Sequence, residues 1–209
     1  MQKILIVGCG DVARRTLPRL LDHYRVYALL RDPAQCAFWR AAGARPILAD
    51  LDHRGSLKRI SGLADLILHF APPPGRGEGD ARMRRLLAAL SQGKSLPQRV
   101  VYISTSGVYG DCAGQRIDET RMLRPTTARA IRRVDAERQL RNFGMRNSVR
   151  VSILRAPGIY AADRLPIERL QNGVYALRPE DDVFTNHIHA DDLALLVCAA
   201  LRYGQANRC

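Results

Sequence analysis

Two glycines and an alanine near the N-terminus have the spacing of a phosphate-binding turn. The pattern Gly8-x-Gly10-x-x-Ala13 follows an apolar run and opens an amphipathic stretch. The first glycine would permit a tight turn, the second would let the backbone approach a pyrophosphate, and the alanine would let a helix pack on the preceding strand. A glycine turn without a ligand is the alternative. We expect dinucleotide binding by Gly8, Cys9, Gly10, Asp11, Val12 and Ala13.

The residues after the second predicted strand bear on which dinucleotide binds. There, Leu30 is followed by Arg31 and Asp32. An acidic side chain at this place binds the ribose 2′-hydroxyl of NAD, whereas an arginine can pair with the 2′-phosphate of NADP. Arg31 therefore favours NADP(H) over NAD(H); the alternative is that Asp32 binds the ribose and Arg31 faces solvent. Asp50 and Leu51, at the end of the third predicted strand, are expected beside the adenine.

Strands and helices must alternate to hold these groups at one edge of a sheet. Runs rich in Ile, Leu and Val predict strands at 3–7, 25–30, 46–49, within 63–70, 99–104 and 148–154. Helical spacing predicts helices at 11–23, 33–42, 80–90, 127–143 and 191–201. Alternation of this kind produces βαβ units with right-handed crossovers. We predict a Rossmann-type α/β fold, a doubly wound parallel sheet with helices on both faces, with residues 1–209 as a single domain.

Two segments interrupt the alternation. Residues 72–79, Pro-Pro-Pro-Gly-Arg-Gly-Glu-Gly, predict a mobile loop. Residues 156–190 contain several prolines and glycines and predict an irregular cap or substrate loop.

The composition is ordinary for a globular chain, with 46% hydrophobic and 25% charged residues. No apolar run approaches the roughly 20 residues that a membrane span needs. The first residues also lack the cleavage site of a signal peptide. We expect a cytoplasmic protein that does not span a membrane.

The net charge is +13, nearly all from arginine. Such a charge attracts nucleotides, phosphates and nucleic acid. Because the arginines are spread along the chain and no recognised module is visible, we expect no specific nucleic-acid partner; charge-driven nucleic-acid binding is the alternative. The cysteine spacing indicates no metal site and favours buried free thiols at Cys9, Cys36, Cys112, Cys198 and Cys209.

Several segments spread over nearly the whole chain carry a family resemblance. Besides the glycine turn, they are Asp50-Leu51, residues 102–111 (Tyr-Ile-Ser-Thr-Ser-Gly-Val-Tyr-Gly-Asp), Asp118-Glu119, residues 155–160 (Arg-Ala-Pro-Gly-Ile-Tyr) and residues 187–194 (His-Ile-His-Ala-Asp-Asp-Leu-Ala). With these segments the sequence resembles the extended and atypical short-chain dehydrogenase/reductase family of the epimerase/dehydratase type.

The resemblance implies a hydroxyl, a tyrosine and a lysine in the active site. By position, the hydroxyl corresponds to Thr105, with Ser104 and Ser106 beside it. The tyrosine and the lysine correspond to Arg129 and Arg133, so both are replaced. An arginine stays protonated and cannot shuttle a proton.

The replacement changes what the helix at 127–143 can contribute. Arg133 could donate to ribose hydroxyls, and Arg129 could bind or polarise an anionic or carbonyl oxygen. Tyr109, Tyr160 and His189 are further proton-transfer candidates by chemistry alone. The alternatives are that Tyr109 stabilises its turn and that His189 orders a loop.

The resemblance also implies further cofactor contacts. Relatives often carry an Asn-Ala-Ala/Gly segment where this chain has His-Phe-Ala-Pro at 69–72. That backbone could line the nicotinamide ribose, or form a plain surface loop. The implied contacts are Phe70, Ala71, Pro72, Ser104, Ala156, Pro157 and Gly158.

The leading hypothesis is an NADP(H)-using oxidoreductase of the epimerase/dehydratase type that acts on a carbonyl or sugar-like small molecule of unknown identity. The alternative is a cofactor-binding sensor or scaffold that has lost catalysis. Relatives usually continue into a C-terminal substrate lobe, so we expect that lobe to be small or incomplete here. The resemblance also implies a homodimer through helices at 80–91 and 127–143, unless these arginine-rich helices face solvent.

Overall fold

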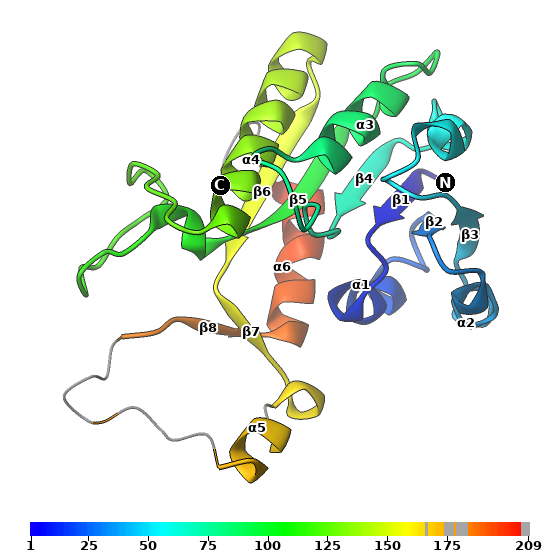
Figure 1. The fold of residues 1–209 in the computed structure, drawn as a ribbon. Helices are drawn as coiled ribbons and strands as arrows, with labels where there is room; N and C mark the ends of the chain where they lie inside the picture. The colour runs from blue at the N-terminus through cyan, green and yellow to red at the C-terminus, as the bar shows by residue number, and fades with distance from the viewer. Residues whose placement is uncertain (166, 174–177, 179–183, 206–209) are drawn as a thin grey trace.

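Six parallel strands form the central sheet (Figure 1). The computed structural model describes residues 1–165, 167–173, 178 and 184–205. The strand order is β3-β2-β1-β4-β5-β6, which is the order of the Rossmann fold. From β1 to β3 the chain adds strands toward one edge of the sheet, and from β4 to β6 toward the other edge, so the order of addition reverses between β1 and β4. The strands are β1 (Lys3–Val7), β2 (Arg25–Leu30), β3 (Arg45–Leu48), β4 (Leu66–His69), β5 (Arg99–Thr105) and β6 (Arg150–Ala156).

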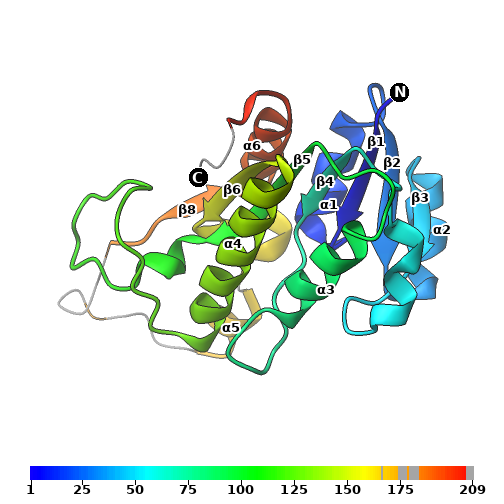
Figure 2. The same ribbon diagram turned by 90° about the horizontal axis from the view of Figure 1, so that it is seen from above.

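Helices cover both faces of this sheet. Helices α3 (Ala81–Leu90) and α4 (Ala128–Asn147) lie side by side on one face (Figure 2). The other face carries α1 (Asp11–Thr16), α2 (Cys36–Ala41) and α6 (Ala190–Tyr203). Residues alternate between the faces, so on β1 Ile4 and Ile6 pack toward α1 and α6, whereas Leu5 and Val7 pack toward α3 and α4. The predicted doubly wound sheet is confirmed.

Several predicted boundaries need correction. The helix predicted at 11–23 ends at Thr16 and continues as a 3-10 turn, Leu17–Arg19. Pro18 explains the change, because it has no N–H to donate to the carbonyl four residues earlier. The helix predicted at 33–42 likewise begins as a 3-10 turn, Pro33–Gln35. The strand predicted at 46–49 lies one residue earlier.

The end of α4 was also predicted too early. The helix runs to Asn147, and Ser148 ends it in the left-handed conformation with φ of 55°. Strand β6 therefore starts at Arg150 and not at the predicted position 148. Two 3-10 turns, Arg54–Ile60 and Ser106–Tyr109, were not predicted.

The segment 156–190 contains short elements where an irregular loop was predicted. It holds β7 (Gly158–Tyr160), a 3-10 turn (Ala162–Arg164), α5 (Ile167–Gln171) and β8 (His187–His189). Strands β7 and β8 form a separate parallel pair. Two three-residue strands far apart in sequence leave little periodicity to detect. Residues 166, 174–177 and 179–183 of this segment lie outside the described residues.

Four cysteines in the described residues are free thiols. Only Cys36 among them is buried; Cys9, Cys112 and Cys198 are partly exposed, and Cys209 lies outside the described residues. None of the helices within the described residues is both long and apolar enough to cross a bilayer.

Candidate dinucleotide site

Two adjoining clefts lie at the carboxyl ends of the strands, where the strand order reverses between β1 and β4. We name them the central cleft, of about 460 Å³, and the outer cleft, of about 290 Å³. Gly8, Cys9 and Pro72 line both. This crevice is where doubly wound folds bind their ligands.

The two glycines of the turn are needed for different reasons. Gly8 has a φ of +95°, and a Cβ there would lie 2.2 Å from the backbone nitrogen of Ala71. Gly10 has an ordinary φ of −87°, and a Cβ there would meet no atom within 4 Å. The fold itself thus requires the first glycine, whereas the second faces open space at the cleft. Ala13 is fully buried, as close packing of α1 on the sheet requires.

The outer cleft brings together the residues expected around the adenine and its ribose. The residues predicted there that line it are Arg31, Asp32, Asp50 and Leu51. Ala71, expected beside the nicotinamide ribose, lines this cleft and not the central one. The Asp32 carboxylate accepts a hydrogen bond from the Ala34 nitrogen at 2.9 Å and caps the 3-10 turn.

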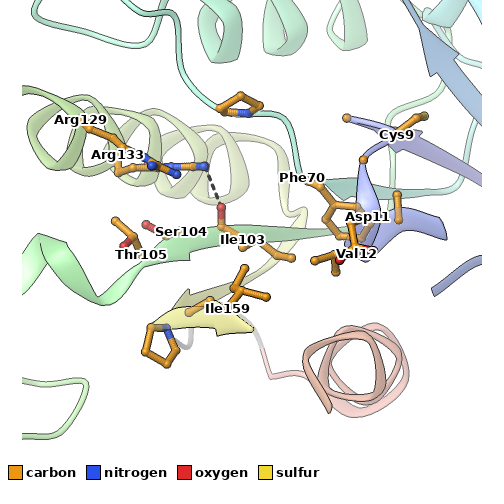
Figure 3. Close-up of a pocket in the computed structure, with 16 residues that line it drawn as sticks. Cys9, Asp11, Val12, Phe70, Ile103, Ser104, Thr105, Arg129, Arg133 and Ile159 are labelled. Atoms are coloured by element: carbon orange, nitrogen blue, oxygen red, sulfur yellow. Dashed lines mark hydrogen bonds between the residues drawn. The ribbon is translucent and has the colours of Figure 1, made fainter. Parts of the chain in front are cut away.

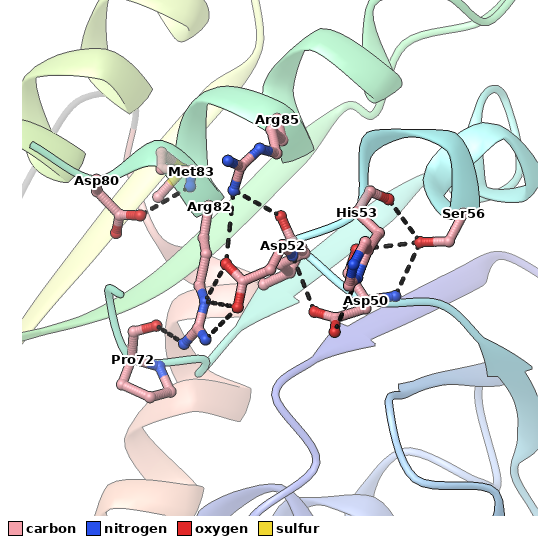
Figure 4. Close-up of polar contacts among 10 residues, drawn as sticks. Asp50, Asp52, His53, Ser56, Pro72, Asp80, Arg82, Met83 and Arg85 are labelled. Atoms are coloured by element: carbon pink, nitrogen blue, oxygen red, sulfur yellow. Dashed lines mark hydrogen bonds and ion pairs between the residues drawn. The ribbon is translucent and has the colours of Figure 1, made fainter. Parts of the chain in front are cut away.

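Within the described residues, Arg31 makes no hydrogen bond or ion pair, and its side chain is exposed. The Asp50 carboxylate is used by its own turn, since Oδ1 accepts from the Asp52 nitrogen at 2.8 Å and Oδ2 lies 3.3 Å from His53 Nδ1 (Figure 4).

Arg82 is an outer-cleft residue that sequence reasoning missed. It projects from the first turn of α3, and its Nε donates to Asp52 Oδ1 at 3.0 Å while Nη1 donates to the Pro72 carbonyl at 3.3 Å (Figure 4). The hydrogen bonds from Arg82 lower the pKa of Asp52. Nothing in the sequence distinguishes Arg82 from its neighbouring arginines, because only the packing of α3 brings it to this cleft.

The central cleft joins the glycine turn to the predicted catalytic groups (Figure 3). Thr105 stands at the end of β5, and its Oγ1 accepts a hydrogen bond from the Gly107 nitrogen at 3.3 Å. Arg129 and Arg133 reach the same cleft from α4. The predicted residues that line it are Gly8, Cys9, Gly10, Asp11, Val12, Ala13, Phe70, Pro72, Ser104, Thr105, Arg129, Arg133, Ala156 and Pro157.

Arg133 is buried and held in place. Its Nη1 donates to Tyr102 Oη and to the Ile103 carbonyl oxygen, both at 2.8 Å (Figure 3 shows the second bond). Its Nε has no hydrogen-bond partner in the described part of the chain. Arg129, in contrast, is exposed.

A buried histidine lies behind Arg133. The ring of His69 is 1% exposed and sits 5.1 Å from the ring of Tyr102. Burial, together with the nearby charge of Arg133, lowers the pKa of His69 to about 3. Burial also raises the pKa of Tyr102 to about 12. Both rings are therefore neutral near pH 7, and neither lines the clefts.

Ser104 lines the cleft, but its hydroxyl is engaged elsewhere. It donates to Glu137 Oε1 at 2.6 Å, and Glu137 also accepts from Arg155 Nη2 at 2.7 Å. Sequence reasoning missed this pairing. A charged residue within the apolar strand of 150–156 was the one available signal, because buried charges are normally paired.

The remaining proton-transfer candidates lie away from the lining of the central cleft. Tyr109 Oη accepts from Arg155 Nη1 at 2.9 Å and is buried. Tyr160 and His189 lie on β7 and β8, with ring centroids 5.3 Å apart. His189 Nδ1 accepts from the Asp191 nitrogen at 3.3 Å and so caps α6.

Gly158 lies outside both clefts as well. A Cβ at this position would lie 2.6 Å from Cδ2 of His187, so the β7–β8 pairing accounts for the glycine.

An ion-pair cluster connects the central cleft to the C-terminal segments. Asp11 lines the cleft and lies 2.9 Å from Arg15 Nε. Arg15 also contacts Asp163 at 2.7 Å and Asp191 at 3.1 Å. One guanidinium thus joins α1 to α6 and to the 3-10 turn at 162–164.

Comparisons with known proteins agree with this geometry. Residues 4–208 match the NAD dependent epimerase/dehydratase family. An alignment of 120 residues that covers 53% of this chain shows 31% identity to a 4-hydroxy-2-methyl-3-oxo-4-farnesyl-3,4-dihydroquinoline-1-oxide ketoreductase from Stigmatella aurantiaca. That match covers 35% of the ketoreductase's length.

Solved structures resemble the whole chain. A conserved protein of unknown function from Silicibacter pomeroyi DSS has a TM-score of 0.74 and 27% identity, over 100% of this chain and 71% of its own. The dTDP-glucose 4,6-dehydratase DesIV of Streptomyces venezuelae has a TM-score of 0.79 and 21% identity, over 100% of this chain and 74% of its own, and shows the shared fold. With the family match over nearly its whole length, the chain belongs to the NAD dependent epimerase/dehydratase family.

Proposed function

We propose that this chain binds a nicotinamide dinucleotide along the two clefts and catalyses hydride transfer with a carbonyl or sugar-like substrate in the central cleft. The main observation behind the proposal is the open space beside Gly10. A Cβ added to Gly10 would meet no protein atom within 4 Å. A pyrophosphate in that space would lie between the two clefts, so that the halves of one dinucleotide could occupy both.

The outer cleft favours NADP(H) over NAD(H) in this proposal. The carboxylates of Asp32 and Asp50 already accept hydrogen bonds from nearby backbone groups, which weakens them as ribose acceptors. Arg31 is exposed and uses none of its donors within the described residues, and Arg82 lines the same cleft. The Arg31 guanidinium suits a 2′-phosphate, which accepts charge-assisted hydrogen bonds, whereas the Arg82 guanidinium is already bonded to Asp52 and adds only its positive charge nearby.

The central cleft supplies groups that could hold a substrate oxygen. A bound nicotinamide would supply or accept the hydride. Thr105 Oγ1 accepts from the Gly107 nitrogen, so its O–H remains free to donate to a substrate oxygen. Arg129, in the lining of the same cleft, would add a permanent positive charge near that oxygen.

The proton for a reduced carbonyl would come from water. Among the described residues that line the central cleft, none is a tyrosine, lysine or histidine. Burial raises the pKa of Cys9 to about 12, and Asp11 is paired with Arg15. The carbonyl carbon would take the hydride, and its oxygen would take a proton from solvent. The Stigmatella relative is a ketoreductase, which supports this class of reaction.

The same lining favours a second candidate, a dinucleotide sensor without catalysis. A cleft without an ordinary proton donor could bind the cofactor and leave it unchanged. A sensor must bind NADPH and NADP⁺ with different affinities, and that difference must alter binding to a partner.

Thermal-shift titration with NAD⁺, NADH, NADP⁺ and NADPH tests cofactor binding, because a ligand of the folded state raises the apparent stability. We expect the largest shift with NADPH. Loss of NADPH fluorescence with a panel of aldehydes, ketones and sugar nucleotides then tests catalysis. No shift with any dinucleotide would exclude both candidates, whereas binding without turnover would favour the sensor.

A further inference from the structure

Two arginines that form no ion pair within the described residues make up one wall of the central cleft. Arg129 and Arg133 stand one turn apart on α4 and both line the cleft. Figure 3 shows them near Ser104 and Thr105, across the cleft from the glycine turn. Like charges four residues apart on a helix repel each other. Without a bound anion, the repulsion between Arg129 and Arg133 therefore lowers the stability of the folded protein.

The carboxylates near the pair are engaged by other groups. Asp11, the acidic residue of the cleft lining, is bonded to Arg15. Glu137, one turn beyond Arg133, accepts from Arg155 and Ser104.

Asp80 interacts electrostatically with Arg133, but its side chain accepts from the Met83 nitrogen at the start of α3. No ion pair joins a carboxylate to Arg129 or Arg133 within the described residues.

The two guanidinium groups differ in how firmly they are held. Arg133 is 5% exposed, and its Nη1 is fixed by Tyr102 and the Ile103 carbonyl. Its buried Nε has no partner among the described residues. Arg129 is exposed and makes no hydrogen bond or ion pair within the same residues. The fixed guanidinium of Arg133 and the movable guanidinium of Arg129 can therefore bind one anion together.

On the basis of the proposed function, we infer that the substrate carries an oxyanion, a carboxylate or a phosphate ester, which binds to Arg129 and Arg133. The exposed, planar guanidinium of Arg129 can pair with such oxygens in a bidentate way, and Arg133, whose Nη1 is already bonded, adds a fixed positive charge beside it. The carbonyl of the same substrate would then accept a hydrogen bond from Thr105, beside the nicotinamide. The pair that replaces the proton-transfer residues would serve to select and orient the substrate.

The test uses protein saturated with NADPH and measures the binding of three small probes by calorimetry. Oxamate represents a carboxylate, inorganic phosphate represents a phosphate ester, and acetamide is the uncharged control. We expect at least one oxyanion to bind and acetamide not to bind. The tighter of the two oxyanions identifies the substrate group.

Substitutions of single arginines on α4 show where the oxyanion binds. Arg129→Gln should weaken the bound oxyanion by about tenfold or more, the effect of losing one charge-assisted pair. Arg129→Lys keeps the charge without the fork and should fall between Arg129→Gln and the unchanged protein. Arg146→Gln, an exposed arginine near the other end of α4, is the matched control and should bind the oxyanion normally.

The outcomes separate the two proposals. Failure to bind NADPH would overturn the proposed function itself. Normal NADPH binding with no preference for either oxyanion over acetamide would overturn the inference alone. Equal weakening by Arg129→Gln and Arg146→Gln would also overturn it, since the affinity would then reflect only the net charge of the protein.

Discussion

Arg155 Nη2 lies 2.7 Å from Glu137 Oε2, and this pair joins β6 to α4 inside the protein. The side chains are 8% and 2% exposed. Because Glu137 also accepts from the Ser104 hydroxyl, the pair holds the end of β5 against α4. The wall of the central cleft that carries Thr105, Arg129 and Arg133 therefore depends on a buried ion pair that lies behind it.

Removal of one partner of this pair should be strongly destabilising. In Glu137→Gln, the buried guanidinium of Arg155 loses its ion pair with Glu137, so we expect the free energy of unfolding to fall by about 3 kcal/mol or more. Urea unfolding measures the change. Glu78→Gln, at an exposed position, is the control and should stay within about 0.5 kcal/mol. Equal midpoints for the two variants would contradict the buried-pair argument.

Replacement by alanine should lower the stability of the protein at Gly8 and leave it unchanged at Gly10. Gly8→Ala places a Cβ 2.2 Å from the Ala71 nitrogen at a φ of +95°. We expect it to lose roughly 2 kcal/mol or more in urea unfolding, because the backbone must shift and a left-handed conformation is costly. Gly10→Ala meets no protein atom, so its stability should equal that of the unchanged protein.

Gly10→Ala should nevertheless weaken NADPH binding by about tenfold or more, because the added methyl occupies the space proposed for the pyrophosphate. Fluorescence titration with NADPH measures this loss. Unchanged affinity in Gly10→Ala would show that no phosphate lies against this turn.

The choice between the two dinucleotides should depend on Arg31. Loss of a charge-assisted pair with the 2′-phosphate should weaken NADPH by about tenfold in Arg31→Ala and leave NADH unchanged. Arg40→Ala, another exposed arginine outside the outer cleft, serves as the control. Asp32→Ala separates the alternatives: if it weakens NADH while Arg31→Ala changes neither affinity, the ribose is bound by Asp32.

Protonation of His69 should make stability depend on pH. In the unfolded chain the histidine takes up a proton below about pH 6.5, whereas in the folded protein its pKa is about 3. The neutral buried ring therefore stabilises the fold above pH 6.5, and this contribution is lost as the pH falls from 6.5 toward 3. Between about pH 7 and pH 5 the loss should reach about 2 kcal/mol.

His69→Phe removes the titrating group and should flatten this part of the stability profile. Urea unfolding at intervals between those pH values measures the slope. His23→Phe, at an exposed position, should retain the slope of the unchanged protein. A steep slope that persists in His69→Phe would assign the effect to another group.

Local patterns determined the scaffold of the site. The strand of Ile, Leu and Val at 3–7, the glycine spacing and Ala13 predicted a strand, a turn and a helix, and the structure contains them. The alternation of strands and helices also predicted the parallel sheet. Both predictions were possible because strand and helix periodicity depend only on residues close together in the sequence. By its family resemblance, the sequence also predicted that Thr105, Arg129 and Arg133 belong to the active site, and all three line one cleft.

Only the tertiary structure decided which groups these residues contact. The bonds from Arg133 to Tyr102, from Arg155 to Glu137 and from Arg82 to Asp52 join residues at least 18 positions apart. Long charged side chains can reach many partners, and the packing of α3 and α4 on the sheet selects among them. Periodicity carries no information about such contacts, because they depend on where separate elements meet in space.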